Sequence, residues 1–557
     1  MKGRDAVVKV LEKHDVAYVF GNPGTTEFGL ITALHGHPSI RYILTLQEAV
    51  ALTIAHMYAN ASGRTGVVNL HVAPGLGNAM GSLYNAAMGK MPLVVTAGQQ
   101  DSRMLIQEPL LSHDLAEIAK PLTKWSVQIQ HAKDIPVVMS RAFKIAQDPP
   151  RGPVFVALPA DVLDDDLTEE IPDPGKYHRD MRPGPGAVEA AADLLLQAKS
   201  PAIICGDGVS ASKAFDELVR MSEVLGAPVW NTLMMGALNF PTSHPHFQGL
   251  LPGEASITRE MLGDTDVVLA VGARLFEAVF YGEGSPLPEG CKLIQLDAAA
   301  WEIGKNLPVE IGILADPKQG LALLEKHLAE KMSSDVRSDA QRRAEAMAVQ
   351  KEHIRKMTAE NADKKRGAVP ISPVRLMSDL KECLPENAVV YNEAITAYID
   401  LLSVIPFDRP GTLYGNHGGG IGQGMPGAIG VKLAHPERPV VALVGDGSAM
   451  YTIQSLWTAA HHDIPVVYVI LANRGYRILK YNMNRYVTLQ HIDTETPYAH
   501  MDFTKPPIDF VELAGSMGVK GRKVMKPEEL QPALREAFAG NTPYVLEVQT
   551  EGRGPGE

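Results

Sequence analysis

Short runs of apolar, often β-branched residues recur along the whole chain, with helix-forming stretches between them. Clear examples are 66–70 (GVVNL), 154–157 (VFVA), 267–271 (VVLAV), 440–444 (VVALV) and 466–471 (VVYVIL). Apolar positions in these runs are continuous rather than alternating, which is typical of strands buried on both faces of a sheet. Because helices separate the strands, the sequence predicts an α/β fold built from doubly wound parallel sheets.

The chain is too long for a single hydrophobic core. It has 557 residues, so several domains are expected. Segments 166–187 and 331–369 are rich in charge or in Pro and Gly, and we interpret them as linkers. They leave three α/β blocks, which we predict to be domains: 1–165, 188–330 and 370–557.

Composition excludes several classes of function. The net charge of −12 argues against nucleic acid as the main partner. No apolar run approaches the roughly 18 residues needed to cross a bilayer, so no membrane partner is expected. The three cysteines, Cys205, Cys291 and Cys383, form neither a disulfide framework nor a zinc pattern. They fit a reducing, cytoplasmic compartment.

The strongest candidate site lies in the third block, where Gly-Asp-Gly-Ser (445–448) follows an apolar run directly. These glycines would let backbone N–H groups approach a phosphate at a helix N-terminus. Asp446 and Asn473 would both follow parallel strands, where α/β sheets bind ligands. Carboxylate, amide and phosphate oxygens together suit Mg²⁺. From spacing alone, a turn that binds nothing stays open.

A second Gly-Asp-Gly in the middle block shows that this tripeptide is a weak signal. Gly206-Asp207-Gly208 also follows an apolar run, and Asn231 lies 24 residues beyond Asp207. Spacing does not exclude this copy.

The segment from Gly445 to Asn473 resembles the cofactor-binding motif of the thiamine diphosphate-dependent 2-oxo acid decarboxylases and carboligases. In that motif the asparagine is often doubled, whereas here Ala472 replaces the first one. The resemblance gives the 206–208 copy a structural role. It implies cofactor binding by Gly445, Asp446, Gly447, Ser448, Asn473, Gly475 and Tyr476, and Mg²⁺ ligation by Asp446, Asn473 and the Gly475 carbonyl.

The resemblance is most specific to the benzoylformate decarboxylases and covers nearly the whole chain. It rests on phrases such as FGNPG (20–24), RYILTLQEA (41–49) and NLHVAPGLGNAMGSLYNA (69–86). It implies that the first domain binds the pyrimidine ring of the cofactor, that the second is a central domain, and that the third binds the diphosphate. Glu48, alternatively a plain helix-start residue, would hydrogen-bond N1′ of the aminopyrimidine and activate the cofactor.

The same resemblance assigns further site residues. His71, alternatively a buried strand-end histidine, would lie near the substrate carboxylate, and the hydroxyl of Thr25 would contact that carboxylate. Thr396 would bind the diphosphate, and the Gly419 carbonyl would accept from the 4′-amino group. Ile421, alternatively a core residue, would hold the cofactor in its bent conformation.

Departures from the decarboxylases concern the substrate. Those enzymes carry a second catalytic histidine within the segment that corresponds to 273–282, and this chain has none there. His417 and His113 are candidates to replace it, and structural or surface roles stay open for both. Ile478 and Asn482 replace pocket positions, so we expect a reshaped and more polar pocket than one made for a phenyl ring.

The sequence therefore predicts thiamine diphosphate- and Mg²⁺-dependent, non-oxidative decarboxylation of a 2-oxo acid, with carboligation of aldehydes also open. The alternatives within the family are an acetolactate synthase-like carboligase and a 2-hydroxyacyl-CoA lyase. Acetolactate synthases usually bind FAD, which is possible here but not favoured. A catalytically silent homologue is the alternative from another class. Relatives imply a homodimer or homotetramer in which Glu48 and Asp446 of different chains complete each site.

Overall fold

The computed structural model describes residues 1–494 and 498–552, and within them the chain forms three six-stranded sheets. Strands pair in parallel. Their order across each sheet differs from their order in the sequence, so helices connect them across both faces. The predicted fold class, three doubly wound parallel sheets, is confirmed.

The chain divides into two compact units. The first comprises Met1–Tyr177, Arg366–Tyr398 and Asn416–Glu557, and the second comprises His178–Lys365 and Ile399–Gly415. The first sheet and five strands of the third sheet thus share a unit, and the residues of the second unit lie between segments of the first along the chain. The domain boundaries given above stay a prediction.

The first sheet has the order β2-β1-β3-β4-β6-β5. Its strands are β1 (Tyr18–Gly21), β2 (Arg41–Leu44), β3 (Gly66–Leu70), β4 (Leu93–Gln99), β5 (Trp125–Gln128) and β6 (Val154–Pro159). The helices around it are α1 (Gly3–Lys13), α2 (Phe28–His35), α3 (Glu48–Ser62), α4 (Val72–Met88), α5 (Leu115–Ala119), α6 (Ile135–Gln147) and α7 (Ala160–Asp164). All residues of β3, β4 and β6 are buried, as their unbroken apolar runs predict.

Within the first unit, strands of the third sheet lie in the order β13-β15-β16-β18-β17. They are β13 (Val389–Glu393), β15 (Val440–Gly445), β16 (Val467–Ala472), β17 (Lys520–Val524) and β18 (Tyr544–Gln549). The accompanying helices are α14 (Pro373–Cys383), α16 (Gly424–Ala434), α17 (Asp446–Tyr451), α18 (Ser455–His461), α19 (Arg477–Leu489), α20 (Phe510–Ser516) and α21 (Leu530–Ala539).

The second unit is built on the sheet β12-β11-β10-β7-β8-β9. Its strands are β7 (Pro201–Cys205), β8 (Val229–Thr232), β9 (Phe247–Leu251), β10 (Val267–Val271), β11 (Lys292–Asp297) and β12 (Ile311–Leu314). Its helices are α8 (Pro185–Gln197), α9 (Gly208–Ala211), α10 (Phe215–Leu225), α11 (Ala255–Leu262), α12 (Pro317–Lys331) and α13 (Ser334–Lys364). Among the described residues, no helix combines the length and apolar character needed to cross a lipid bilayer.

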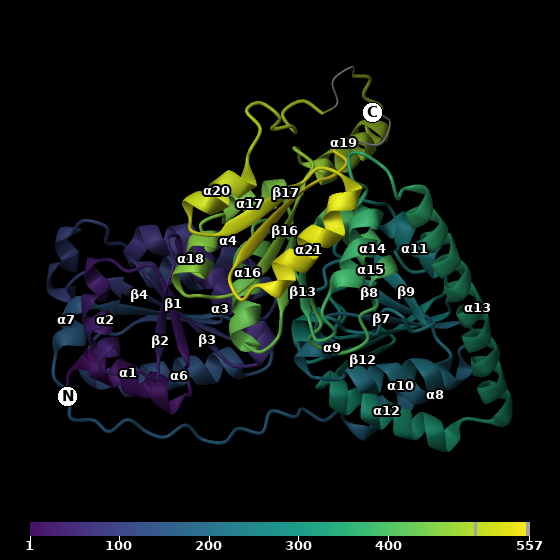
Figure 1. Cartoon of the computed structure of the whole chain (residues 1–557). Coiled ribbons are helices and arrows are strands. Elements are labelled where there is room, and N and C mark those ends of the chain that lie inside the picture. Colours follow the sequence, from purple (N-terminus) through teal and green to yellow (C-terminus); the bar gives the residue numbers. More distant parts are fainter. Residues whose placement is uncertain (495–497, 553–557) are drawn as a thin grey trace. The chain divides into compact units, whose positions relative to one another are not determined.

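Helix α3 joins the first and third sheets by packing directly on α16 (Figure 1). Every residue of α3 from Val50 to Ala59 is buried, so the helix is covered on all sides rather than along one stripe. Gly430 of α16 lies on the α3 backbone, where an added Cβ would clash with the Ile54 carbonyl oxygen and stand 2.8 Å from the Tyr58 nitrogen. Only glycine permits this approach.

We predict that Gly430→Ala destabilises the first unit, because the added methyl group meets backbone atoms that cannot swing away. The free energy of unfolding should fall by about 1–3 kcal/mol in denaturant titrations. Gly515→Ala is the matched control, since Gly515 lies in α20 with open space around its Cβ position. That control should be neutral or slightly stabilising. Equal stabilities for the two variants would contradict the close helix contact.

Candidate active site

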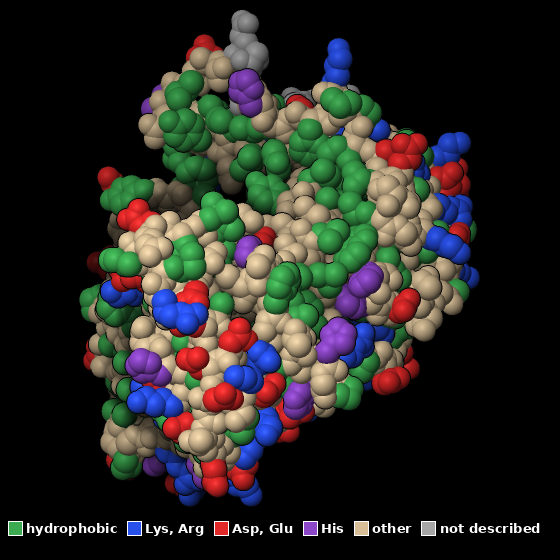
Figure 2. Space-filling model, turned by 90° about the vertical axis from the view of Figure 1, so that its left-hand side faces the viewer, with side chains coloured by type: hydrophobic (Ala, Val, Ile, Leu, Met, Phe, Trp, Pro, Cys, Tyr) green, Lys and Arg blue, Asp and Glu red, His purple; other side chains and the backbone are tan. Residues whose placement is uncertain are grey.

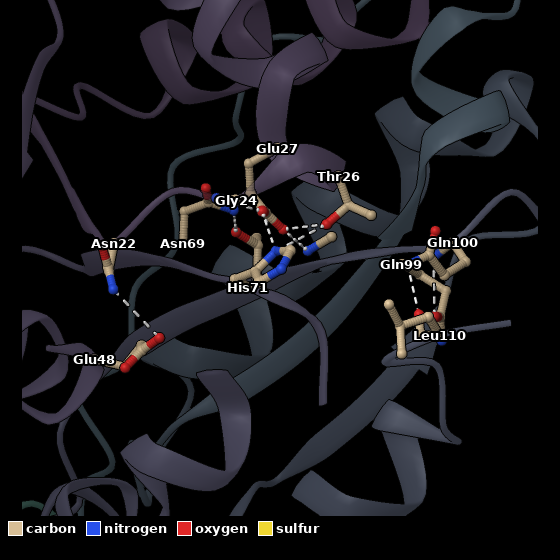
Figure 3. Close-up of polar contacts among 12 residues, drawn as sticks. Asn22, Gly24, Thr26, Glu27, Glu48, Asn69, His71, Gln99, Gln100 and Leu110 are labelled. Carbon is tan, nitrogen blue, oxygen red and sulfur yellow. Dashed lines mark hydrogen bonds and ion pairs between the residues drawn. The ribbon is translucent and has the colours of Figure 1, made fainter. Parts of the chain in front are cut away.

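A buried carboxylate organises the turn that follows β1. Glu27 Oε2 accepts from the Gly24 nitrogen at 2.9 Å and pairs with His71 Nδ1 at 2.8 Å (Figure 3). Its Oε1 accepts from Thr26 Oγ1 at 2.8 Å and from the Gly98 nitrogen at 2.9 Å. Gly24 must be glycine, because a Cβ there would overlap the His71 ring. Four contacts therefore fix this carboxylate and the imidazole beside it.

This network determines which nitrogen of His71 can exchange a proton. An ionised carboxylate only accepts hydrogen bonds, so Nδ1 of His71 carries the hydrogen that points at Glu27. Nε2 of the neutral ring then keeps a lone pair. The His71 side chain remains 24% exposed, whereas that of Glu27 is fully buried. The ring thus has one anchored nitrogen and can present the other to a small molecule.

Glu48 is the first residue of α3 and lies near this histidine network (Figure 3). Its side chain is buried, and Asn78 Nδ2 donates to its Oε2 at 3.0 Å. Asn22 Nδ2 lies 3.5 Å from Oε1. A Cβ on Gly75 would stand 3.2 Å from the same oxygen. The carboxylate is therefore held by two neutral amides, which leave it free to exchange a proton with a ligand.

The two other candidates in the first sheet's domain are more exposed. Thr25 begins the short 3₁₀ helix at Thr25–Glu27 and is exposed, whereas the next residue, Thr26, is buried in the network. His113 is also exposed, and its Nδ1 accepts from the Asp114 nitrogen at 2.9 Å. Their predicted catalytic roles stay predictions.

The predicted metal ligands lie in one connected turn at the ends of β15 and β16. Asp446 begins α17, and its carboxylate accepts from the backbone nitrogens of Gly447 at 2.9 Å and Arg474 at 2.5 Å. Asn473 Oδ1 accepts from the Gly475 nitrogen at 3.1 Å. A single hydrogen-bonded turn therefore brings Asp446, Asn473 and Gly475 together.

The donor set suits a hard cation beside phosphate. Asp446 is buried, and this burial raises the pKa of its carboxyl to about 6, because desolvation outweighs the backbone hydrogen bonds. A divalent cation would relieve that desolvation of the carboxylate. Among the described residues, no cluster of three or more His, Cys, Asp or Glu side chains could hold a metal. One carboxylate, one amide and one carbonyl match Mg²⁺, which takes its remaining ligands from phosphates and water.

The other predicted cofactor residues surround this turn. Gly447 faces the Tyr476 ring, since a Cβ on it would stand 2.6 Å from the ring. Ser448 is buried on α17, Gly445 precedes that helix as its N-cap, and Thr396 lies half-buried just after β13. Their roles in diphosphate binding stay predictions.

The glycine-rich turn 416–423 precedes α16 and is held by a second buried carboxylate. Glu393, at the end of β13, accepts from Asn416 Nδ2 at 3.0 Å and from the nitrogens of Gly422 and Gln423 at 2.8 and 2.9 Å. Burial raises the pKa of its carboxyl, which these hydrogen bonds counteract. Gly419, with φ of +84°, and Ile421 lie on the exposed side of the turn.

His417 is placed differently from a residue that would contact substrate. It is only 3% exposed, and its Nδ1 lies 3.0 Å from Nε2 of His56 on α3. Its predicted acid–base role stays a prediction.

The Gly-Asp-Gly of the second unit is part of an internal turn. The Asp207 carboxylate accepts from the Gly236 nitrogen at 3.0 Å and from Asn239 Nδ2 at 3.1 Å. Gly208 lies against Gly272, with 2.5 Å between its added Cβ and the Gly272 Cα. This packing supports the structural role that the resemblance implies for residues 206–208.

Sequence reasoning missed Glu27, Glu393 and His56. Glu27 follows the phrase FGNPG (20–24) by three residues, and Glu393 ends the apolar run of β13. A carboxylate at the end of a buried apolar run is a signal that could have found Glu393. No local pattern marks His56, because its partner His417 lies 361 residues further along the chain.

Comparison with known proteins shows the family to which this chain belongs. Three domain models of thiamine pyrophosphate enzymes match: the N-terminal TPP binding domain at residues 1–118, the central domain at 188–324 and the C-terminal TPP binding domain at 396–548. The chain belongs to the thiamine pyrophosphate enzyme family.

Individual relatives span nearly the whole chain. Benzoylformate decarboxylase from Pseudomonas aeruginosa is 32% identical over 560 residues, covering 98% of each chain. A probable acetolactate synthase large subunit from Methanocaldococcus jannaschii is 30% identical, covering 98% of this chain and 92% of that one. The solved 4-hydroxybenzoylformate decarboxylase of Rhodococcus jostii RHA1 matches with a TM-score of 0.87 at 30% identity, covering 99% and 100%.

We predict that Glu27→Gln destabilises the first unit. All four partners of this carboxylate point hydrogens at it, and the amide NH₂ of glutamine would face two of them. The unfolding free energy should fall by about 1–3 kcal/mol in urea titrations. Thr25→Val, at an exposed position two residues earlier, should change it by less than about 0.5 kcal/mol. A Glu27→Gln variant as stable as this control would show that the network does not depend on the carboxylate.

Proposed function

We propose that this chain is a thiamine diphosphate- and Mg²⁺-dependent decarboxylase of a 2-oxo acid, able also to join the resulting fragment to an aldehyde. The observation that carries the proposal is the anchored His71–Glu27 pair beside Glu48. It supplies two groups that can exchange protons, each just after a strand of the first sheet: Glu48 is buried, and His71 is partly exposed.

The cofactor would be held by the residues whose donor sets fit it. Asp446, Asn473 and the Gly475 carbonyl would ligate Mg²⁺, while Gly445, Gly447, Ser448, Tyr476 and Thr396 would surround the diphosphate. Gly419 and Ile421 would meet the pyrimidine side. When bound, thiamine diphosphate supplies an electron sink for the charge left as carbon dioxide departs.

The protein's own groups would handle protons and orientation. The Glu48 carboxyl would exchange a proton with the cofactor ring. Nε2 of His71, once it has taken up a proton, would donate to the substrate carboxylate and later deliver that proton to the reacting carbon, while Glu27 holds the ring in one orientation. The Thr25 hydroxyl, exposed beside this network, would donate to the same carboxylate.

Carboligation is the second candidate function. The segment 273–282 has no histidine to assist aldehyde release, and an acetolactate synthase is among the relatives. A fragment that is not protonated quickly can attack a second carbonyl instead. Bound FAD, which the sequence leaves open, would favour this branch, and so a yellow colour of the purified protein would support it. A 2-hydroxyacyl-CoA lyase and a silent homologue stay as alternatives for a protein that releases no carbon dioxide.

The first experiment measures carbon dioxide release from aromatic and aliphatic 2-oxo acids. We expect release that requires both thiamine diphosphate and Mg²⁺ and that ceases after EDTA treatment. Because Ile478 and Asn482 reshape the pocket, small or polar acids should be preferred over benzoylformate. If the cofactor binds and no acid is decarboxylated, the decarboxylase assignment is wrong, and acyloin and acyl-CoA substrates become the next panel.

Two aspartates that share the same tripeptide allow a matched test of the cofactor site. Asp446→Ala should weaken Mg²⁺-dependent retention of thiamine diphosphate by about a hundredfold, the range expected for a lost charged ligand. Asp207→Ala removes the corresponding carboxylate from the second unit, where it accepts from the Gly236 nitrogen and from Asn239. It should lower stability and leave cofactor retention unchanged. The reverse pattern would move the cofactor site to the second unit.

A second copy of the chain would be needed to complete each site. Glu48 begins α3, and His56, eight residues later on the same helix, contacts the glycine-rich turn. Within one chain, about 12 Å of helix therefore separate Glu48 from the contact with that turn. Exposed apolar side chains of the first unit also suit a partner surface, and Figure 2 shows hydrophobic side chains gathered in patches on one face. The exposed apolar residues of the first unit include Phe28, Leu46, Ile106, Leu110 and Tyr451. We therefore propose a cytoplasmic homodimer or homotetramer.

Mixed dimers test this arrangement directly. Glu48→Gln and Asp446→Ala homodimers should each be nearly inactive. After co-expression, half of the dimers are mixed, and each of these contains one intact site if the two residues come from different chains. Activity should then recover to about one quarter of wild type. Activity that stays at the level of the homodimers would mean that one chain builds a whole site by itself.

A further inference from the structure

The glycine-rich turn 416–423 is fastened on its inner side by side chains from several elements. Gln423 Nε2 donates to the carbonyls of His417 at 2.8 Å and Gly420 at 2.7 Å. Asn85 of α4 accepts from the Gly420 nitrogen at 3.0 Å. Together with Glu393, described above, these contacts fix the ends and the middle of the turn.

The outer side of the turn carries the atoms that would meet a ligand. A Cβ added to Gly419 would have open space around it, and the Ile421 side chain is 39% exposed. Four of the eight residues from 416 to 423 are glycines, so the backbone has many alternative conformations when it is not held. The placement of Gly419 and Ile421 therefore depends on what holds the inner side.

His417 is a second point, besides Asn85, where the first sheet's domain contacts this turn. Its Nδ1 lies 3.0 Å from Nε2 of His56, and the ring centroids are 4.9 Å apart. His56 is fully buried on α3, and burial lowers the pKa of its imidazole well below the usual 6.5, with the neighbouring His417 lowering it further. His56 is therefore neutral, and one of the two facing nitrogens donates to the other.

The position of the His417 ring also depends on Gly89, which has no side chain to occupy the same space. A Cβ on Gly89 would stand 2.7 Å from Cγ and 2.8 Å from Cδ2 of His417. Gly89 ends α4 with φ of −74°, a conformation that any residue adopts, so the backbone itself does not require glycine. The space that Gly89 leaves is occupied by the imidazole. Both α3 and α4 therefore define where His417 sits.

We propose that His56 is a positioning residue for cofactor binding: through His417 it fixes the turn that presents Gly419 and Ile421. The inference rests on the proposed function, because it takes thiamine diphosphate as the ligand of that turn. It gives His417 a role in holding the turn, with Nδ1 engaged inside the protein rather than directed at a substrate. His56 contacts neither cofactor nor substrate and acts only through His417.

The test compares cofactor affinity among variants of α3. His56→Leu removes the hydrogen bond and keeps the volume, and it should raise the dissociation constant of thiamine diphosphate, measured by calorimetry with saturating Mg²⁺, about tenfold (~1.4 kcal/mol). His56→Gln, which can again offer an N–H at this position, should restore the constant to within about threefold of wild type. Thr53→Val is the matched control, because it removes a buried hydrogen bond from α3 to Ser82 instead of to the turn. It should lower the melting temperature and leave the constant within about twofold.

Gly89→Ala provides an independent variant that leaves both histidines in place. Its methyl group should displace the His417 ring and weaken cofactor binding to a similar extent, even if His56→Leu fails to fold. Cofactor constants within about twofold of wild type for Gly89→Ala and for any folded His56→Leu would overturn the proposal. A wild-type protein that binds no thiamine diphosphate would instead overturn the proposed function itself.

Discussion

The close packing of α3 on α16 is the contact on which the rest of the first unit depends. It joins the sheet that carries Glu48 and His71 to the sheet that carries Asp446, with Gly430 allowing the two backbones to approach. Helix α3 begins at Glu48, and α16 follows the glycine-rich turn. The contact between the two helices therefore fixes the position of Glu48 relative to that turn. Loosening it would move groups that lie in different parts of the sequence.

Two buried carboxylates then set the local geometry on either side of that contact. Glu27 orders the turn beside His71, and Glu393 orders the turn that presents Gly419. In both cases backbone N–H groups of glycines are among the hydrogen-bond donors, and glycines have no side chains of their own to stabilise the segment. A carboxylate with several such donors gives these segments one conformation, which is the property a cofactor site requires.

The sequence is sufficient for the fold and for the class of protein, because unbroken apolar runs and the motif at 445–473 are local signals. Its resemblance to a known family also selects Glu48, His71 and Asp446, whose roles stay predictions. It does not identify Glu27 or Glu393, whose importance comes from the donors that converge on them. It cannot identify His56, because contact with His417 exists only after two domains have packed together. The sequence likewise does not show that Thr25 is exposed while Thr26 is buried, because the conformation of the turn and not the residue type decides this.

The order of elements along the chain has a consequence for biosynthesis. Helix α3 ends at Ser62, whereas the helix that covers it, α16, is complete only at Ala434. At ribosomal speeds of about 5–20 residues per second, the apolar face of α3 waits roughly 20–75 seconds for its partner, while the whole second unit is made in between. During that interval the nascent first domain is a natural client for chaperones that bind exposed apolar helices. Expression at a slower translation rate would lengthen the exposure and favour aggregation over assembly.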